Sequence, residues 1–294
     1  MPDFTSLFDS FASLPPFECL QPRFMRQALL GLLLLAPITA VTGVQVVNLG
    51  MAFFADAISH SIFAGVSLGL LLAMDPRWST IGLALLIGVG ITACKRRVTL
   101  SSDSIIGVFF AGVTAFGLAA ASREKAVARN AQSFLYGDIL TLGGWEISLL
   151  LLALVAVFAF QLIGYNRLLY LGLDPVVAGA HGVEVGTYQY AFAVFLALTS
   201  VLAVWTVGVF LVSALLVLPA ATARNLSGSA GGMFWWALAL SWIASVSGLV
   251  VSAQRWAGTA TGPTIVLIAA LFFIISVPLR GWHGRGVVTH RERK

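Results

Sequence analysis

The chain has 294 residues, of which 59% are hydrophobic and only 10% are charged, and its formal net charge is +5. This much apolar surface cannot be hidden inside a soluble core, so the composition excludes a soluble globular protein. The Lys and Arg residues lie mostly at the ends of apolar runs, where membrane topology places them, so the basic balance does not indicate binding to nucleic acid.

Residues 1–22 are predicted to form an extracytoplasmic segment at the membrane interface. Apolar side chains recur at helical spacing from Phe4 to Leu14, and Pro15 and Pro16 end the pattern. The segment has no basic n-region and so does not match a cleaved signal peptide. The alternative interpretation is a frayed tail.

The region 23–280 is predicted to hold about nine transmembrane helices, within a range of eight to ten, because apolar runs of about 20 residues follow one another. The predicted spans are 24–48, 51–74, 79–94, 103–121, 145–164, 187–206, 207–223, 232–253 and 262–279. The sixth and seventh spans adjoin around Thr206 and Gly208, so a tight hairpin or a broken helix pair is expected. The fold class is an all-α integral membrane protein with one transmembrane domain.

Small residues within the spans are predicted to allow close helix packing in lipid. Gly65, Gly69, Gly107, Gly112 and Gly117 are among them. Residues 65–69 formally match the Gly-x-Ser-x-Gly elbow of hydrolases, but that motif works on a strand-to-helix turn and here lies inside a membrane helix. These glycines are therefore assigned to packing.

The cluster at 95–97 and the basic tail at 281–294 predict the cytoplasmic side, and an odd number of spans then places the N-terminus outside.

Two connections between the predicted spans are long. The first, 122–144, mixes charged and apolar residues and is predicted to dip back into the membrane. The second, 166–186, contains Asp174 as a helix N-cap, Pro175 at the first helical position and Gly182 as a stop. A short helix is therefore expected in this cytoplasmic loop.

Asp56 and His60 are the ionisable pair that lies well inside an apolar run. A carboxylate in the bilayer costs at least a few kcal/mol, so such residues usually face a protein-lined cavity and mark an ion path. Their spacing places both on one helix face, about 6 Å apart along the axis. Carboxylate oxygen and imidazole nitrogen suit Zn, Mn or Fe(II). Two ligands make an incomplete site that lets an ion leave, and a second copy of the chain across a twofold axis would supply two more.

Ser59 and Ser61 flank His60 and are candidates to orient its ring, although hydroxyls in such helices more often bond to their own backbone. The competing interpretation is that Asp56 and His60 pair with each other or relay protons. Metal handling is favoured over that interpretation because of the burial cost. Cys19 and Cys94 lie far apart and do not indicate a metal cluster.

ATP use by this chain is not expected, because no Gly-x-x-x-x-Gly-Lys-Ser/Thr loop occurs in it. Any ATP hydrolysis is expected from a separate subunit, and the chain itself is not predicted to be an enzyme.

Several ordered segments resemble the permeases of zinc and manganese ABC importers, the metal-transport class often called ABC-3. They are RFMRQALL at 23–30, DAISHS at 56–61, DSIIG at 103–107, FLYGDIL at 134–140, LDP at 173–175 and VSALLVLPAATAR at 212–224. The resemblance covers nearly the whole chain after Pro22. Two departures stand out: Val176 and Val177 replace an acidic residue usual after the Asp-Pro, and residues 48–50 replace a pair of basic residues before the second span.

The resemblance implies a multi-pass protein of the bacterial cytoplasmic (inner) membrane with a bundle like that of type II ABC importers. It implies a homodimer bound to two cytoplasmic ATPases and fed by an extracytoplasmic metal-binding protein, with no permanently bound cofactor. Asp56 and His60 fall on the family's metal path, and the helix after Asp174, closed by Gly182, resembles the one that couples to the ATPase.

The transported ion is expected to be zinc, with manganese or iron as alternatives, since mixed oxygen and nitrogen ligands accept several metals. A proton-coupled secondary carrier is the competing transport function and would use Asp56 and His60 as proton sites. An intramembrane metalloenzyme would need a fuller ligand set than these two residues. A scaffold without transport leaves the buried charge unexplained.

Overall fold

The computed structural model describes residues 21–123, 139–254 and 257–283, and the regular structure within them is helical. The elements are α1 (Arg23–Asn48), α2 (Ala52–Leu71), α3 (Pro76–Arg97), α4 (Ser102–Ala121), η3 (Ile139–Thr141), α6 (Gly144–Leu173), α7 (Pro175–Ala180), α8 (Val185–Val207), α9 (Val209–Leu226), α10 (Ala230–Ser252) and α11 (Thr261–His283). Within this part of the chain, nine helices are long and apolar enough to cross a membrane. The prediction of an all-α protein with about nine spans is confirmed.

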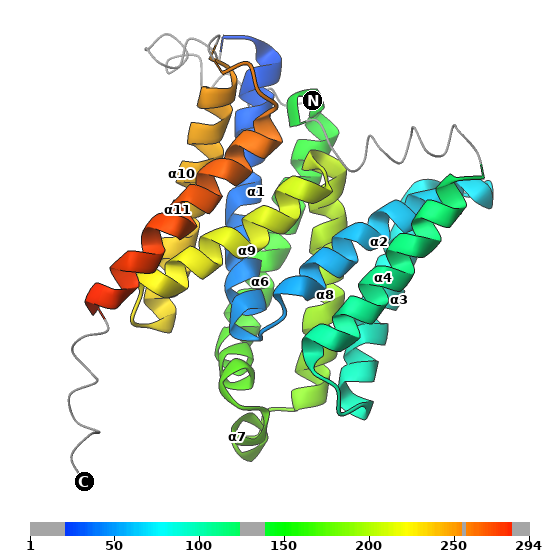
Figure 1. Cartoon of the computed structure of the whole chain (residues 1–294), viewed down its shortest axis with the longest axis vertical. Coiled ribbons are helices and arrows are strands. Elements are labelled where there is room, and N and C mark those ends of the chain that lie inside the picture. The colour runs from blue at the N-terminus through cyan, green and yellow to red at the C-terminus, as the bar shows by residue number, and fades with distance from the viewer. Residues whose placement is uncertain (1–20, 124–138, 255–256, 284–294) are drawn as a thin grey trace.

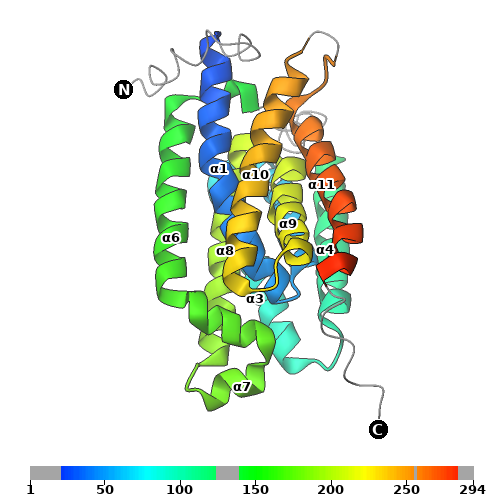
Figure 2. The same cartoon turned by 90° about the vertical axis from the view of Figure 1, so that its left-hand side faces the viewer.

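The helices form one elongated bundle in which α1 begins at one end and α11 finishes at the other (Figure 1). The short helix α7 lies at the end where α11 finishes, called here the α7 end (Figure 2). Lys95, Arg96 and Arg97 occupy the last turn of α3, which also lies at the α7 end (Figure 1). The basic cluster and the α7 loop thus share one side, as the predicted topology requires. Nearly all of the N-terminal segment, most of the predicted re-entrant connection and most of the basic tail fall outside the described residues.

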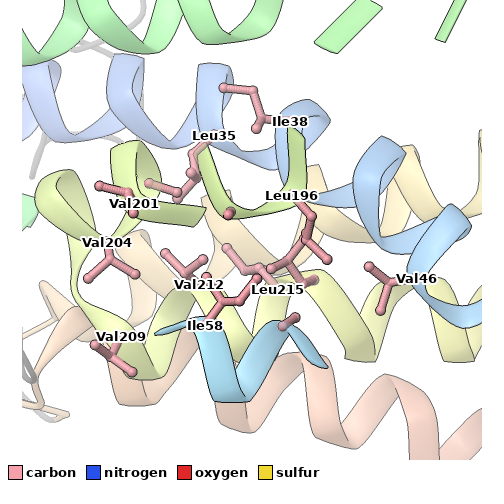
Figure 3. Packing of buried hydrophobic residues seen from close by; sticks show 14 of the residues in the cluster. Leu35, Ile38, Val46, Ile58, Leu196, Val201, Val204, Val209, Val212 and Leu215 are labelled. Carbon is pink, nitrogen blue, oxygen red and sulfur yellow. The ribbon is translucent and has the colours of Figure 1, made fainter. Parts of the chain in front are cut away.

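The centre of the bundle is formed by α1, α2, α8 and α9, which come from distant parts of the sequence. Leu35 and Ile38 of α1, Leu196 of α8 and Val212 and Leu215 of α9 are almost fully buried and meet there. Figure 3 shows Ile58 of α2 lying against the same cluster. Because α2 is the helix that carries Asp56 and His60, this core fixes the position of the candidate site.

Helix α6 is longer than the sequence analysis predicted. A span over 145–164 and a connection from Asn166 were expected, whereas α6 runs for 30 residues to Leu173. Its length of about 45 Å exceeds the hydrocarbon core of about 30 Å. Asn166 and Arg167 mark the water boundary without breaking the helix, and only the Asp174–Pro175 step ends it. The predicted end of this helix was wrong because the polar residues after position 164 were interpreted as the end of the helix. Helix α6 instead continues past them to α7.

The joint between α8 and α9 consists of one residue, Gly208, with φ 89° and ψ 161°. This backbone conformation lies in the region that residues with a Cβ rarely adopt. The two helices turn back on each other there (Figure 1). The tight connection expected around Thr206 and Gly208 is therefore present, as a sharp corner at the end of the bundle opposite α7.

Close helix approach at glycines holds the bundle together, although not at every predicted position. Gly65 and Gly69 pack α2 onto the first turns of α3, as a Cβ at either would meet the Pro76 or Thr80 backbone at 2.9 Å or less. A Cβ at Gly107 or Gly112 of α4 would instead meet nothing within 4 Å. The close packing predicted for these two glycines is therefore not made within the described part of this chain, and their open side faces outward.

The tightest of these contacts predicts a loss of stability on substitution. A Cβ at Gly43 would lie 2.0 Å from the carbonyl oxygen of Leu216, which belongs to the backbone of α9. We expect Gly43→Ala to force α1 and α9 apart and to cost about 1–3 kcal/mol of stability. Thermal unfolding of the purified chain in detergent measures this as a lower Tm. The matched control is Gly82→Ala, since Gly82 is exposed on α3 and its Cβ would meet nothing. Equal Tm values for the two variants would contradict the expectation.

Candidate functional site

Helix α2 presents its apolar residues and its ionisable residues on different sides. Ala55, Ile58 and Ile62 are fully buried against the core, whereas Asp56 and His60 are only partly buried. Since residues four apart in a helix stack above one another, both ionisable groups point from the same side of α2. The structure therefore keeps the one-faced arrangement that the spacing predicts.

The imidazole of His60 packs edge-on against Phe110 of α4, with ring centroids 4.9 Å apart and an interplanar angle of 78°. Neither flanking serine hydrogen-bonds to this ring in the described structure. The Ser61 hydroxyl donates to the Ile58 carbonyl of its own helix at 2.6 Å, and the buried Ser59 hydroxyl has no partner among the described residues. The described contact that positions the imidazole is thus aromatic rather than polar.

Within the described residues, Asp56 and His60 do not belong to a complete metal cage. No group of three or more His, Cys, Asp or Glu side chains comes together in the described residues. A resident structural metal usually has four protein ligands. Two ligands on an open helix face instead suit an ion that is held briefly.

Helix α4, beside this face, carries a row of exposed small residues. Gly107, Ala111, Ala115 and Ala119 recur every four residues along α4, and all four are exposed. Helix α4 packs along α2 (Figure 1). Rows of small residues at this spacing let membrane helices approach closely. The open side of the α2–α4 pair therefore combines the two candidate ligands with a surface suited to another helix.

Helix α7 has the start and the stop that the sequence predicts. The Asp174 carboxylate accepts the Val176 backbone N–H at 2.7 Å. At the other end, Gly182 has φ 75°, its N–H donates to Gly179, and the Val183 N–H donates to Ala178. These two bonds close the helix in a Schellman motif, which needs a left-handed residue at this position.

The loop with α7 and the two helices that flank it, α6 and α8, are joined by contacts of aromatic rings. The His181 ring stacks on Tyr170 at the end of α6, with centroids 5.5 Å apart. The Arg167 guanidinium lies 5.2 Å from the Tyr188 ring of α8 and donates to the hydroxyl of that tyrosine. By contrast, Val176 is 80% exposed. The residue that follows α7 is thus packed against α6, while α7 itself presents apolar surface outward.

Two cavities border α2 toward its two ends. The first, of about 190 Å³, lies between the start of α2 and α7 and is lined by Met51, Phe54 and Pro175 among others. The second, of about 470 Å³, lies at the end opposite α7 and reaches Val66 of α2. Helix α7 therefore lies across the first cavity from the start of the helix that carries Asp56 and His60, so a displacement of α7 would act next to that helix.

Sequence reasoning missed one buried polar contact. Gln45 donates to the side-chain oxygen of Gln161 at 3.2 Å, and Gln161 donates to the Val41 carbonyl at 3.1 Å. These bonds join α1 to α6 inside the bundle. The sequence did carry a signal for this contact: Gln45 and Gln161 each lie within an apolar run, and an amide there must find a hydrogen-bond partner in lipid.

Comparisons with known proteins match most of this chain. The model of the ABC 3 transport family matches residues 21–280. The high-affinity zinc uptake system membrane protein ZnuB of Haemophilus influenzae is 29% identical over 261 residues, which cover 89% of this chain and 97% of that protein. The manganese import system permease protein ScaB of Streptococcus gordonii is 31% identical, covering 86% and 90%. The solved structure of PsaBC from Streptococcus pneumoniae, in complex with Fab, superposes with a TM-score of 0.74 at 30% identity, covering 87% and 91%.

Proposed function

The chain belongs to the ABC 3 transport family, and we propose that it forms the membrane channel through which an ATP-driven importer takes up zinc. As a family member with nine apolar helices in its described part, it is a multi-pass permease subunit of the bacterial inner membrane. Relatives named for zinc uptake and for manganese import support a divalent metal as the cargo. We propose zinc among these metals, with manganese or iron as the alternatives: carboxylate and imidazole are ligands that zinc takes in proteins, and a relative that the chain matches over most of its length is named for zinc uptake.

The observation that carries this proposal is the placement of Asp56 and His60 on one partly open face of a membrane helix. Ionisable groups at this depth are costly unless a function needs them. A passing cation meets that condition, since the carboxylate neutralises part of its charge and the imidazole replaces a water ligand. Release stays fast because one chain supplies only two ligands.

A second copy of the chain is proposed to complete the path. The exposed row of small residues on α4 supports close packing against another membrane helix, and it lies beside the face with Asp56 and His60. In a twofold dimer the partner presents the same two ligands, so the path offers two pairs of groups that the ion can occupy in turn. An extracytoplasmic metal-binding protein is proposed to deliver it at the end opposite α7.

A cytoplasmic ATPase is proposed to dock on α7. The exposed Val176 offers apolar surface. The stacking of His181 on Tyr170 of α6, and the contact of Arg167 of α6 with Tyr188 of α8, support transmission of a movement of α7 into the bundle. Because Pro175 shares a cavity with Met51 and Phe54, movement of α7 acts next to the start of α2. ATP-driven closure would then open the inner side of the path below Asp56.

The test is uptake into proteoliposomes that hold the purified chain alone or together with the ATPase that co-purifies with it. We expect radiolabelled zinc to accumulate only with both subunits, the binding protein and ATP, and unlabelled manganese to compete more weakly than unlabelled zinc. Uptake by the chain alone, driven by a proton gradient, would establish a secondary carrier instead. Stronger competition by manganese would overturn the choice of zinc while leaving the importer intact.

A further inference from the structure

The cavity at the end opposite α7 has no role in the proposed transport path. It measures about 470 Å³ and lies between the first turns of α3 and α6 and the last turn of α8. Val66, Ile81 and Leu202 give it an apolar wall. Its rim carries polar and aromatic side chains, so the cavity combines an apolar interior with a charged mouth.

Three of the chain's eight tryptophans, Trp78, Trp145 and Trp205, line this one cavity. Trp78 and Trp145 are 71% and 56% exposed. Tryptophan collects where membrane meets water, because its ring is apolar and its N–H is polar. The cavity therefore lies at the depth of the lipid head groups.

Both exposed tryptophans head a row of exposed apolar residues that runs along a membrane helix. On α3, the exposed Leu86 lies about two turns beyond Trp78, rotated by about 80° around the helix axis. On α6, the exposed Leu152 lies seven residues after Trp145, on the same side of the helix. Surface of this kind suits acyl chains, so a molecule seated in the cavity can continue into the bilayer.

The charges at the mouth have both signs. The Arg77 guanidinium has no hydrogen bond or salt bridge among the described residues, and only its backbone N–H is bonded, to the Asp75 carboxylate at 2.9 Å. Glu146 uses one carboxylate oxygen to accept the Gly143 N–H at 3.0 Å. Each carboxylate keeps a second oxygen, so the cavity offers one cationic group and two anionic acceptors.

We propose that this cavity binds the head group of phosphatidylethanolamine. Arg77 takes the phosphate, which guanidinium groups bind with charge-assisted hydrogen bonds. The carboxylates of Asp75 and Glu146 take the ammonium, and the tryptophan rings favour the same cation. An anionic lipid without an amine would leave both carboxylates unpaired beside its phosphate. A docked soluble protein would leave the apolar rows below the cavity uncovered, so a lipid is the better fit.

The experiment is native mass spectrometry of the full-length chain, titrated in detergent with phosphatidylethanolamine or phosphatidylglycerol. We expect phosphatidylethanolamine to bind more tightly, and Arg77→Gln to weaken its binding roughly tenfold through loss of the phosphate partner. Asp75→Asn keeps the helix cap and removes the charge, so it should erase the preference between the two lipids. The matched control for Arg77→Gln is Arg123→Gln, since Arg123 is exposed and does not line the cavity.

Equal binding of the two lipids by the unaltered chain, or equal loss in Arg77→Gln and Arg123→Gln, would overturn the proposal. Loss of capture by the extracytoplasmic metal-binding protein in Arg77→Gln, with lipid binding unchanged, would also overturn it and assign the cavity to that protein. Arg77→Lys keeps the charge and should retain most of the binding, which separates loss of the phosphate contact from misfolding. The proposal does not depend on metal transport, so its failure leaves the importer function untouched.

Discussion

Asp56→Ala and His60→Ala are each expected to lower zinc uptake by about 100-fold while the chain still inserts and pairs with its ATPase. Loss of a residue that merely orients a metal ligand already costs about 10- to 100-fold, and these substitutions remove a proposed ligand itself. Both side chains are partly exposed on α2, so alanine leaves the buried face of the helix in place. Uptake of radiolabelled zinc in proteoliposomes containing the whole complex measures the effect.

The matched control for both variants is Ser67→Ala. Ser67 is fully buried on the same helix, and its hydroxyl has no hydrogen-bond partner among the described residues. Its loss removes a polar group from α2 without touching the proposed path, so uptake should stay near that of the unaltered chain. Full uptake by either Asp56→Ala or His60→Ala would reject the metal path, whereas equal loss in Ser67→Ala would point to damage of α2 as a whole.

Asp174→Ala is expected to uncouple ATP hydrolysis from transport. Helix α7 has only six residues, and the carboxylate that caps it would be lost. Loss of such a cap costs about 1–2 kcal/mol, enough to lower the folded population of an isolated turn by roughly 5- to 30-fold. Zinc transported per ATP hydrolysed should fall, as measured by parallel uptake and phosphate-release assays on one preparation.

Asp174→Asn separates the cap from the charge. Asparagine caps helices about as well as aspartate, so this variant should couple normally if the carboxylate acts only by accepting the Val176 N–H. Equal losses in the alanine and asparagine variants would show that the negative charge itself contacts the ATPase. Normal coupling in both would remove α7 from the proposed mechanism.

Much of this fold could be predicted because lipid imposes simple rules on a sequence. The apolar runs located the nine helices, and the Asp174–Pro175 step and Gly182 located α7, since caps and stops act through local backbone chemistry. The same locality explains why the i, i+4 placement of Asp56 and His60 needed no structure. A single helix fixes which of its own residues share a face.

Relations between distant helices could not be predicted in the same way. Nothing local distinguishes Gly43, which touches the α9 backbone, from Gly107, which faces outward. The pairing of Gln45 with Gln161 depends on how α1 and α6 align, and the contact of His60 with Phe110 depends on how α2 and α4 do. The length of α6 was misjudged because polarity marks where water begins, while only backbone chemistry marks where a helix ends.

Pro175 of α7 and Phe54 of α2 lie on the walls of one cavity of about 190 Å³. A displacement of α7 that narrows this cavity would bring the two walls toward each other, and only a displacement large enough to close it would press on α2 directly. In the proposed mechanism, the helix with Asp56 and His60 would then respond to a full movement of the attached ATPase and not to its small fluctuations.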